Sequence, residues 1–509
     1  MKLRELVEGL EVEIICGDLD TEVVSITNDS RKAEKDCLYF AVPGARVDGA
    51  EFIADVIRHG ASVVVTEKNE KQLSVELNND IFMNGSFEGV DENVVTIISV
   101  ENVRYAMGIM SSKFYQDPSD ELVVIGITGT KGKTTTTFMI KKVLEKQGIK
   151  TGIIGTIAEY SGDRKIEDSD RTSPDAIHLQ YLLSQMVNDG CQAVVMEVSS
   201  QSLKLHRVNG CEFDMAIFTN FSEDHIGDRE HPDMEDYFNS KVKLFKMCNE
   251  GFINADDLNS LRIPKLAPNC NIKTYGIDNQ CNLLAKDITI TNSYVDFRVK
   301  INGRNERVKA FIPGRFSVYN CLAAICVAEK MGCSTESIKQ ALEEVRVPGR
   351  SELVDNDLEL TLMIDYAHSP ESLQSILNAV KSYTRGKVIS VFGCGGDRDK
   401  GKRPQMGEIS GKIADYTIIT SDNPRTEDPE KIIKDIEEGI KKTKGKYECI
   451  VDRTEAIKKA IETAGKRDIV VFAGKGHETY QEINHIKNPY DERVIIKEII
   501  SQMKKKKQS

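Results

Sequence analysis

The stretch "GITGTKGKTTTT" at residues 126–137 contains the residue types that bind nucleotide phosphates. Gly129 and Gly132 would let backbone N–H groups approach an anion, and a helix that starts here would add the positive end of its dipole. Lys133 would then reach the β- and γ-phosphates, while the Thr134 hydroxyl would bind Mg²⁺. The chemistry to expect from this stretch is phosphoryl transfer from a magnesium nucleotide.

The loop is shifted from the general pattern Gly-x-x-x-x-Gly-Lys-[Ser/Thr], which needs a glycine at position 127, where this chain has Ile127. Its surroundings nevertheless fit a phosphate loop. The apolar run "ELVVIGIT" predicts a buried strand, "GTKG" a turn, and "KTTTTFMIKKVLEKQG" an amphipathic helix that ends at Gly148. A strand, a glycine turn and a helix in this order indicate a nucleotide site in spite of the shifted glycine.

Acidic and histidine side chains follow two further apolar runs. "VVMEVSS" places Glu197 among apolar residues, and "TNFSEDH" ends with Asp224 and His225. A buried carboxylate is costly unless it is paired or bound to a cation. Glu197 is therefore a candidate magnesium ligand, and His225 is a second.

Apolar strands alternate with helical patterns along most of the chain, which predicts an α/β fold. We expect three domains, at residues 1–117, 118–345 and 346–509, with the polar linker "QDPSD" between the first two. The central block should be an ATPase-type domain with a phosphate loop and a parallel or mixed sheet, and the last block a Rossmann-like α/β domain. In the second and third blocks, the unusual polar residues come just after apolar strands. Ligands of such sheets bind beyond the carboxyl ends of the strands, so we expect substrate between these two blocks.

Composition excludes several other classes of protein. The chain has 509 residues, 40% of them hydrophobic and 29% charged, and a net charge of −12. That charge disfavours nucleic-acid binding, which needs a basic face. No segment reaches the ~20 consecutive apolar residues of a membrane span, and the N-terminus has no apolar signal region. The twelve cysteines include no Cys-x-x-Cys pair, so we expect free thiols, no structural metal and a cytoplasmic protein.

The loop and its neighbours together resemble the Mur ligase family of peptidoglycan synthesis, whose "GTKGKT"-like loop is shifted in the same way. The resemblance spans roughly residues 120–485, and the first block adds "NDSR" and "CLYFAVPGARVDG", which are similar to the family's uridine-nucleotide-binding domain. The other matching motifs occur in the family's order: "EVSS", "TNFSEDH", "YFNSKVKLF", "FSVYNCLAA", "VPGRSE", "DYAHSP", "FGCGGDRDKGKRP", "SDNPRTEDP" and "AGKGHETYQ".

The resemblance implies an ATP-dependent acid–amino-acid ligase. ATP phosphorylates a peptide carboxylate, an amine attacks the acyl phosphate, and phosphate leaves, so no nucleophilic Ser or Cys is needed. Two Mg²⁺ ions are implied, held by Thr134, Glu197, His225 and Lys241, with Lys241 carbamylated to an anion. The expected catalytic residues are Lys133, Glu197, His225 and Lys241. The ATP-binding residues implied are Gly129, Thr130, Lys131, Gly132, Lys133, Thr134, Thr135, Asn320, Arg350 and Asp365.

The expected acceptor substrate is UDP-N-acetylmuramoyl-L-alanyl-D-glutamate. The family positions that hold it match Ser30, Thr172, Ser173, Ser199 and Arg207. Arg207 supplies a guanidinium fork suited to a carboxylate. The family often has Thr and His where this chain has Ser173 and Gln201; serine keeps the hydroxyl, whereas the match at position 201 is weaker.

The motif "DNPR" at residues 422–425 indicates which amine is added, because family members that use meso-2,6-diaminopimelate carry it and lysine-adding relatives usually lack the arginine. Diaminopimelate has a distal carboxylate that Arg425 can bind through two hydrogen bonds, and a site built around a buried arginine should reject lysine. The family positions for this substrate match Arg398, Asp422, Asn423, Pro424, Arg425, Gly474 and Glu478, with Glu478 placed for an ammonium group.

Other functions remain open on the sequence alone. One is the lysine-adding ligase of the same family, and another is a folylpolyglutamate synthetase, against which "NDSR", "DNPR" and "GKGHE" weigh. An ATP-driven switch would need only the phosphate loop. We expect a monomer, no nucleic-acid partner and no membrane partner.

Overall fold

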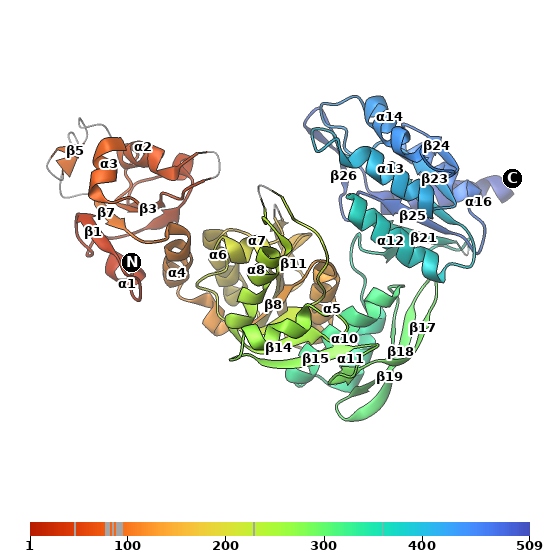
Figure 1. The fold of residues 1–509 in the computed structure, drawn as a ribbon, viewed down its shortest axis with the longest axis horizontal. Coiled ribbons are helices and arrows are strands. Elements are labelled where there is room, and N and C mark those ends of the chain that lie inside the picture. The colour runs from red at the N-terminus through yellow and green to blue at the C-terminus, as the bar shows by residue number, and fades with distance from the viewer. Residues whose placement is uncertain are drawn as a thin grey trace. The chain divides into compact units, whose positions relative to one another are not determined.

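The computed structural model describes residues 1–44, 47–76, 82–83, 86–87, 95–169, 171–227, 230–358 and 360–508 (Figure 1). These residues form two compact units. The first consists of Met1–Lys133 and Gly148–Lys273, and the second of Thr134–Gln147 and Thr274–Ser509. The first segment of the first unit therefore ends at Lys133 of the phosphate loop, and the residues that follow, Thr134–Gln147, are grouped with the second unit.

A five-stranded sheet of order β1-β7-β4-β3-β2 forms the N-terminal part of the first unit. Alternate strand residues face opposite sides: Leu38 and Phe40 join one buried cluster, whereas Cys37 and Tyr39 join another. The elements here are α1 (Leu3–Leu6), β1 (Glu13–Cys16), β2 (Ser25–Thr27), β3 (Cys37–Phe40), α2 (Ile53–Arg58), β4 (Val63–Thr66), α3 (Glu70–Glu76), β5 (Phe82–Met83), β6 (Ser86–Phe87), β7 (Thr96–Ser99) and α4 (Val103–Phe114).

A larger sheet, most of whose strands belong to the first unit, has the strand order β11-β10-β9-β12-β8-β13-β14-β15-β16. Its central strands β9, β12, β8, β13 and β14 are parallel, whereas β10 pairs antiparallel with both its neighbours. The elements are β8 (Val123–Thr128), β9 (Thr151–Ile154), β10 (Ala158–Ser161), β11 (Arg164–Asp168), α6 (Ala176–Asn188), β12 (Ala193–Glu197), α7 (Ser200–Lys204), β13 (Phe213–Phe218), α8 (Met234–Lys246), β14 (Cys248–Asn254), α9 (Ile263–Leu266) and β15 (Asn271–Gly276).

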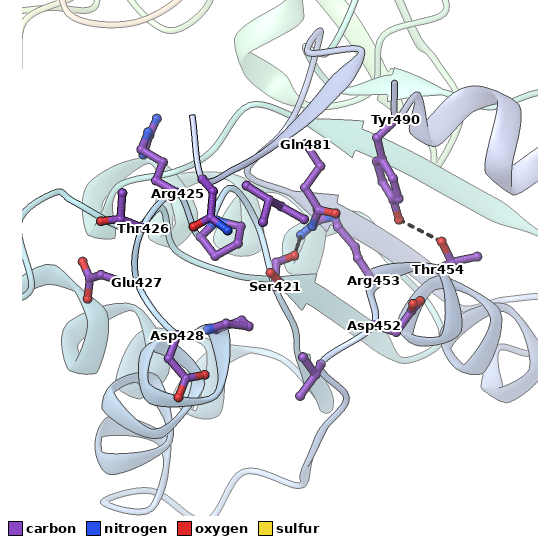
Figure 2. A pocket seen from close by; sticks show the side chains of 15 residues that line it. Ser421, Arg425, Thr426, Glu427, Asp428, Asp452, Arg453, Thr454, Gln481 and Tyr490 are labelled. Atoms are coloured by element: carbon purple, nitrogen blue, oxygen red, sulfur yellow. Dashed lines mark hydrogen bonds between the residues drawn. The ribbon is translucent and has the colours of Figure 1, made fainter. Parts of the chain in front are cut away.

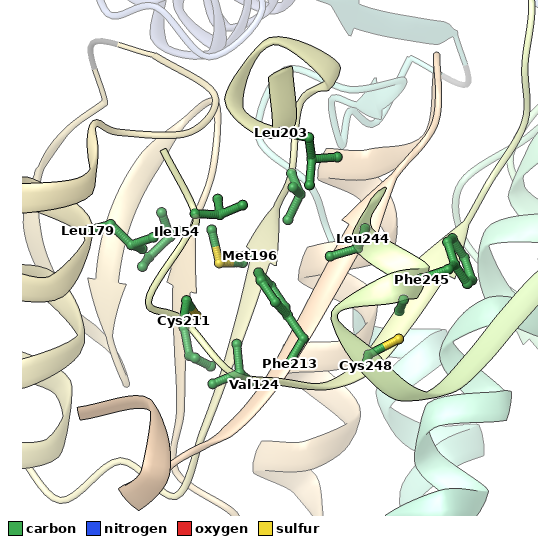
Figure 3. Close-up of a cluster of buried hydrophobic side chains, with 14 of the residues drawn as sticks. Val124, Ile154, Leu179, Met196, Leu203, Cys211, Phe213, Leu244, Phe245 and Cys248 are labelled. Carbon is green, nitrogen blue, oxygen red and sulfur yellow. The ribbon is translucent and has the colours of Figure 1, made fainter. Parts of the chain in front are cut away.

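One face of this sheet packs on α6 and α8 (Figure 3). Val124, Met196 and Phe213 of the strands meet Leu179 of α6 and Phe245 of α8 in the same buried cluster. Because β12, β8 and β13 are neighbouring parallel strands, their carboxyl ends lie along one edge of the sheet. The packing thus fixes the edge from which the phosphate loop and the two polar motifs project.

Among the described residues, the second unit contains α5 and three further sheets, the smallest of which has two strands. In α5 the first turn follows the phosphate loop directly, and Met139 contacts Cys321 of α10. The antiparallel sheet β17-β18-β19 lies between α5 and the last block in sequence. The elements are α5 (Lys133–Lys146), β16 (Leu283–Leu284), β17 (Lys286–Ile290), β18 (Val295–Ile301), β19 (Arg304–Ala310), α10 (Arg315–Lys330) and α11 (Thr335–Glu344).

A six-stranded sheet of order β20-β21-β25-β22-β23-β24 forms the last block, parallel except at β20. Helices cover both faces: one buried cluster joins the strands to α12, α13 and α14, and the other joins them to α15 and α16 (Figure 1). The elements are β20 (Glu352–Leu353), β21 (Thr361–Asp365), α12 (Pro370–Tyr383), β22 (Val388–Phe392), α13 (Lys402–Ile413), β23 (Tyr416–Ile419), α14 (Pro429–Ile440), β24 (Tyr447–Cys449), α15 (Arg453–Thr463), β25 (Ile469–Ala473), β26 (Tyr480–Ile483), β27 (Ile486–Pro489) and α16 (Glu492–Gln508).

The predicted α/β class, with parallel and mixed sheets, is confirmed by these topologies. The expected boundaries at residues 117 and 345 stay predictions, because the division into two units follows contacts and not the three expected blocks. Across the part of the chain that the structure describes, no helix has both the length and the apolar character needed to cross a membrane.

Candidate active site

The phosphate loop follows β8 and is held by the end of the neighbouring strand β13. The Lys131 backbone N–H donates to Asn220 Oδ1 over 2.9 Å, while Thr219 Oγ1 and Asn220 Nδ2 both donate to the Lys131 carbonyl. Gly129 has a φ of 139°, and a side-chain carbon there would lie 2.0 Å from Thr219 Oγ1. Only glycine fits this position, because both the backbone angle and the contact exclude a side chain.

The two lysines of the expected catalytic set converge on this loop. Lys133 Nζ donates to the carbonyls of Gly129 and Thr130, at 3.0 Å each. Lys241 Nζ donates to the Gly129 carbonyl over 2.9 Å, from a side chain that is 1% exposed. The loop carbonyl of Gly129 therefore joins two residues that are far apart in the sequence.

The environment of Lys241 disfavours its charged form. Burial, with the cation of Lys133 as a second cause, lowers the pKa of the Lys241 amine well below its ordinary value. The amine also lies 4.4 Å from the centre of the Tyr237 ring. A buried amine with a lowered pKa is a better nucleophile at neutral pH than an exposed lysine.

Helix α8 brings Lys241 to the loop. It begins at Met234, where the Asp233 side chain accepts the Asp236 N–H and acidic residues fill the first turn. Its buried stripe includes Tyr237, Phe238 and Phe245, three or four residues from Lys241 along the helix. Lys241 therefore lies on the apolar face of the helix and is drawn into the interior.

Glu197, the last residue of β12, is 1% exposed. Its two carboxylate oxygens accept the backbone N–H and the hydroxyl of Thr156, over 2.9 and 3.1 Å. A side-chain carbon on Gly155 would lie 2.5 Å from this carboxylate, so the glycine leaves room for it. The donors at Glu197 keep an anion in place at the edge where the phosphate loop also lies.

His225 lies in the loop after β13, with a left-handed φ of 57°. Its Nδ1 is 3.1 Å from Glu230, and its ring centre is 5.9 Å from that of Tyr237. Within the described residues, no group of three or more His, Cys, Asp and Glu side chains is arranged to hold a metal ion. Two of the four expected magnesium ligands, Thr134 and Lys241, are not residues of these types. This absence therefore does not test the expected set, which stays a prediction.

The residues expected to bind the muramoyl dipeptide lie beside Glu197. Ser173 is buried, and its hydroxyl donates to the Glu197 carbonyl over 2.9 Å and accepts the Ser199 N–H over 3.1 Å. Ser199 in turn caps α7 by accepting the Ser202 N–H. Thr172 Oγ1 lies 3.2 Å from Thr156 Oγ1. Ser173 thus supports the turn, while Thr172 and Ser199 are partly exposed.

Arg207 follows α7 and is half-buried, and its guanidinium makes no hydrogen bond or ion pair to any residue that the structure describes, although its backbone N–H donates to the Ser202 carbonyl over 2.9 Å. Burial lowers the pKa of its guanidinium, with Arg171 and Arg104 as further causes. A guanidinium among like charges is ready to bind an anion. Ser30, the remaining residue of the expected set, begins a short 3-10 turn (Ser30–Lys32) that Asp29 caps.

Two residues expected to contact ATP have buried nitrogens without a partner among the described residues, namely Asn320 Nδ2 and Arg350 Nε. Asn320 lies in α10, and its Oδ1 accepts the Thr136 hydroxyl over 3.3 Å. Arg350 lies 5.1 Å from the centre of the Tyr366 ring. A buried polar nitrogen without a partner costs free energy that a ligand can recover, so both positions fit a nucleotide.

Asp365 ends β21 and accepts the backbone N–H groups of Ser351 and Ala367, over 2.8 and 3.0 Å. Burial raises the pKa of its carboxyl, against the nearby charge of Arg350, which lowers it. Asp365 therefore ties the residue after Arg350 to the end of this strand.

The "DNPR" loop follows β23, and Arg425 in it has a left-handed φ of 52°. Its Nε donates to Glu482 over 2.9 Å and its Nη1 to the Gly396 carbonyl over 2.8 Å. Nη2 has no partner among the described residues, so one edge of the guanidinium remains able to donate. Arg398 is exposed in the neighbouring loop. A side-chain carbon on Gly395 would lie 2.9 Å from Arg425 Nη1 and 3.9 Å from Arg398 Cγ, so both arginines lie close to this glycine.

Asn423 and Glu478 are joined by a lysine that the sequence patterns do not single out. Asn423 Nδ2 donates to Glu478 Oε2 over 2.8 Å, and Lys475 Nζ donates to Asn423 Oδ1 and to the same Glu478 oxygen, over 3.0 and 3.1 Å. Lys475 is completely buried. Gly474, with a φ of 113°, lets Asp422 approach, because a side-chain carbon would lie 2.5 Å from its Oδ2.

Pro424 and Arg425 line a pocket of about 470 Å³ (Figure 2). Arg425, Thr426 and Glu427 lie on one side of the labelled set, while Asp452, Thr454 and Tyr490 lie on the other. The loop that we expect to bind the amine therefore borders this pocket.

His231 is a second residue that no sequence pattern singles out. It is completely buried, with Nδ1 2.6 Å from Asp236 Oδ2 and Nε2 2.8 Å from Ser200 Oγ. Because an ionised carboxylate only accepts, Nδ1 carries the proton and Nε2 accepts the Ser200 hydroxyl. His231 occurs in the polar run "DREHPDMED", where no local pattern separates it from an exposed loop histidine.

Three family models match the chain in succession. "Mur ligase family, catalytic domain" matches residues 22–115, "Mur ligase middle domain" residues 127–328, and "Mur ligase, glutamate ligase domain" residues 349–476.

Full-length relatives carry the name UDP-N-acetylmuramoyl-L-alanyl-D-glutamate–2,6-diaminopimelate ligase. That of Caldanaerobacter subterraneus subsp. tengcongensis is 44% identical over 506 residues, covering 99% of this chain and 100% of the relative. Ligase 1 of Clostridium acetobutylicum is 43% identical with the same coverage. A solved structure of a ligase of this name is 29% identical and superposes with a TM-score of 0.70, covering 99% of both chains.

Proposed function

The chain belongs to the Mur ligase family, and from this premise we propose that it joins meso-2,6-diaminopimelate to UDP-N-acetylmuramoyl-L-alanyl-D-glutamate at the expense of ATP. The product would be a peptidoglycan precursor. The observation that carries the proposal is the 44% identity, over 99% of this chain, to a ligase named for this reaction. The arginine in the "DNPR" loop supports the same amine.

The residues present fit ATP. Gly129 has space only for a backbone, and Gly132 has a left-handed φ of 87°, as a loop around phosphates requires. The buried Asn320 Nδ2 and Arg350 Nε would gain the partners that they lack among the described residues. Lys133 would exchange its two carbonyl partners for phosphate oxygens.

The residues also fit Mg²⁺, which prefers oxygen ligands. Glu197 offers a buried carboxylate, and Thr134 offers a hydroxyl at the first turn of α5. When bound, two Mg²⁺ ions would neutralise charge on the phosphates and on the acyl phosphate. We include His225 and a carbamylated Lys241 as the other ligands.

In the proposed reaction the protein contributes positioning and charge. The carboxylate of the dipeptide attacks the γ-phosphorus of ATP, ADP leaves, and the amine then attacks the acyl carbon and expels phosphate. Lys133 would balance the charge on the transferred phosphoryl group. Exclusion of water would protect the acyl phosphate from hydrolysis.

Carbamylation of Lys241 would follow from its surroundings. The neutral amine adds to CO₂, forming an N–C bond and releasing one proton, and the product is a carbamate anion. Burial and the nearby Lys133 lower the pKa of the amine and so favour the form that reacts. The reaction would also turn repulsion between two lysines into attraction.

Charged side chains of the protein would pair with the charged groups of both substrates, the dipeptide and the amine. Arg207, which lies near the like charges of Arg171 and Arg104, would bind a carboxylate of the dipeptide. Arg425 would bind the distal carboxylate of diaminopimelate through the edge that Glu482 and Gly396 leave open. Glu478 Oε1 would receive an ammonium group, because Asn423 and Lys475 both bind Oε2.

Release of phosphate with each of two amines tests the proposal. With ATP and the UDP-linked dipeptide present, meso-diaminopimelate should support turnover and L-lysine should not. Equal or faster turnover with L-lysine would overturn the choice of amine in favour of the lysine-adding ligase. Phosphate release in the absence of dipeptide and amine would instead favour an ATP-driven switch, and turnover with a folate and glutamate would favour a folylpolyglutamate synthetase.

Arg425→Ala in the same assay tests the proposed contact. We expect the preference for diaminopimelate over lysine, measured as the ratio of kcat/KM values, to fall at least about tenfold because the distal carboxylate loses its cation. Arg425→Lys is the matched control, since it keeps the charge and should recover part of the preference. An unchanged ratio in Arg425→Ala would remove Arg425 from the site. A monomeric state and a cytoplasmic location stay predictions.

A further inference from the structure

Two loops carry the arginines expected to bind the amine, and neither arginine lies in a helix or strand. We call residues 393–400, after β22, the first arginine loop and residues 420–428, after β23, the second. Asp397, just before Arg398, and Arg425 both have left-handed φ angles, of 54° and 52°. Such angles are uncommon outside glycine and persist where surrounding contacts hold the backbone.

Hydrogen bonds join the two loops along their length. Gly396 N–H donates to the Asn423 carbonyl over 2.9 Å. The Asp397 carboxylate accepts the Thr426 N–H over 3.1 Å and the Thr426 hydroxyl over 2.7 Å. The Arg425 guanidinium itself donates to the Gly396 carbonyl. A displacement of one loop would therefore displace the other.

Glu427 connects this pair of loops to the helices beneath. One carboxylate oxygen accepts the Asp397 N–H over 2.7 Å and Arg403 Nη2 over 2.8 Å, and the other accepts Arg403 Nη1 over 3.0 Å. Arg403 belongs to α13, is completely buried, and also donates to Asp435 of α14 over 2.8 Å. The hydrogen bonds from Arg403 are the main cause that lowers the pKa of Glu427 to about 2.

Both oxygens of Glu427 are thus occupied by protein donors, although the residue borders the pocket beside Arg425 (Figure 2). Because both of its oxygens are already bound, Glu427 would affect the site through the backbone that it binds. It accepts the backbone N–H of Asp397, directly before Arg398, from its own position two residues after Arg425. The Arg403 side chain of this bidentate pair is 0% exposed and that of Glu427 is 17% exposed.

We propose that Glu427 and Arg403 are positioning residues that determine the specificity of the amine pocket. By fixing the backbone of Asp397, whose carboxylate in turn binds Thr426, they hold Arg398 and Arg425 where the carboxylates of an amino acid with a second, distal carboxylate can meet both. Lysine has no group to benefit from this placement. The inference rests on the proposed function, because it assumes that this pocket binds the amine.

Glu427→Gln tests the proposal in the full-length enzyme. The amide keeps an acceptor for the Asp397 N–H but loses the charge and the two-oxygen contact with Arg403, which retains Asp435. We expect the KM for meso-diaminopimelate to rise at least about tenfold and the preference over L-lysine to fall by a similar factor, as when a bound group is misplaced. The KM values for ATP and for the UDP-linked dipeptide should stay within about twofold. An equal rise in the KM values of all three substrates would instead indicate general damage to the enzyme.

Arg403→Lys is the second variant, because it keeps the buried charge and loses the fork. It should show the same pattern, a selective rise in the KM for diaminopimelate. Glu408→Gln is the matched control: it removes an exposed Glu–Lys pair from the same helix α13 and should leave all KM values unchanged. Thermal unfolding and near-UV circular dichroism of each variant report whether it is folded.

The outcomes separate the inference from the proposed function. Wild-type enzyme that does not use diaminopimelate overturns the proposed function and, with it, this inference. A wild type that prefers diaminopimelate, with Glu427→Gln and Arg403→Lys both retaining that preference and KM, overturns the inference alone. It is also overturned if the variants lose all three substrates equally or do not fold, since the network would then be structural only.

Discussion

Lys241 differs from its neighbours Lys243 and Lys246 in where its amine lies. It donates to the carbonyl of Gly129 in the phosphate loop, whereas Lys246 is exposed on the same helix. Burial lowers the pKa of the Lys241 amine, with Lys133 as a further cause, so that the amine beside the phosphate loop loses its proton more readily than an exposed lysine does. At the scale of one residue, the structure thus supplies a chemical reason for the proposed modification.

Lys241→Ala should reduce turnover at least about 100-fold, the size of effect seen when one group that balances transition-state charge is lost. The measurement is phosphate release with all three substrates and added bicarbonate. Lys246→Ala, on the same helix, is the matched control and should remain active. Full activity of Lys241→Ala with or without bicarbonate would contradict the role. In wild-type enzyme, ¹³C-bicarbonate should yield a carbamate NMR signal that the alanine variant lacks.

At the scale of elements, His231 connects α7 and α8. Through Ser200 it holds the helix that Ser199 caps, and through Asp236 it holds the helix that carries Lys241. Lys204 donates to the same Asp236 oxygen over 2.8 Å. The dipeptide side and the lysine side of the expected site are therefore linked by one neutral, buried imidazole.

His231→Gln should lower stability by about 1–3 kcal/mol, because the Ser200 hydroxyl or the Asp236 carboxylate loses part of its pairing. The effect should depend on pH. Burial lowers the pKa of His231 in the folded protein, so protonation favours the unfolded chain. Its stabilisation is complete above the ordinary histidine pKa of about 6.5 and is lost as pH falls towards the lower folded value.

Urea unfolding of wild type and variant at about pH 7.5 and about pH 5.5, on either side of that pKa, measures this effect. We expect wild type to lose more stability between the two pH values than His231→Gln does. His178→Gln, which changes a partly exposed histidine that faces Glu167, is the control. A variant with the same pH dependence as wild type would show that His231 does not titrate on unfolding.

At the scale of the whole molecule, the last block has what an independent domain needs. Its sheet carries a buried cluster on each face, one with α12, α13 and α14 and the other with α15 and α16. Two covered faces around one parallel sheet are a stable arrangement for a chain of this size. The expected boundary near residue 346 can therefore be tested by expression.

Residues 346–509 expressed alone should fold and show a single cooperative urea transition, with a free energy of unfolding within the usual range of about 5–15 kcal/mol. Far-UV circular dichroism and intrinsic tyrosine fluorescence should change together through the transition. The complementary fragment 1–345 provides a comparison. A C-terminal fragment without a cooperative transition would place the boundary elsewhere, for example where the second compact unit takes in residues 274–345.

The sequence by itself determined the α/β class, the family and the positions of polar residues after apolar strands. These features are local: the continuous apolar runs of the strands, the glycines of the phosphate loop, and motifs such as "DNPR" need only neighbouring residues. The burial of Lys241 was not evident in this way, because a lysine close to Lys243 and Lys246 also fits an exposed position on a helix, and only the family resemblance singled it out.

Only the tertiary structure decided which side chains meet. The contact from Lys241 to Gly129 spans 112 residues, and that from Lys475 to Asn423 spans 52. Glu427 and Arg403 are ordinary charged residues in sequence, and become a buried pair because α13 and α14 pack beneath both arginine loops. Partners of this kind are chosen by the path of the chain between them, so no local pattern can report them, and the same holds for His231 between Ser200 and Asp236.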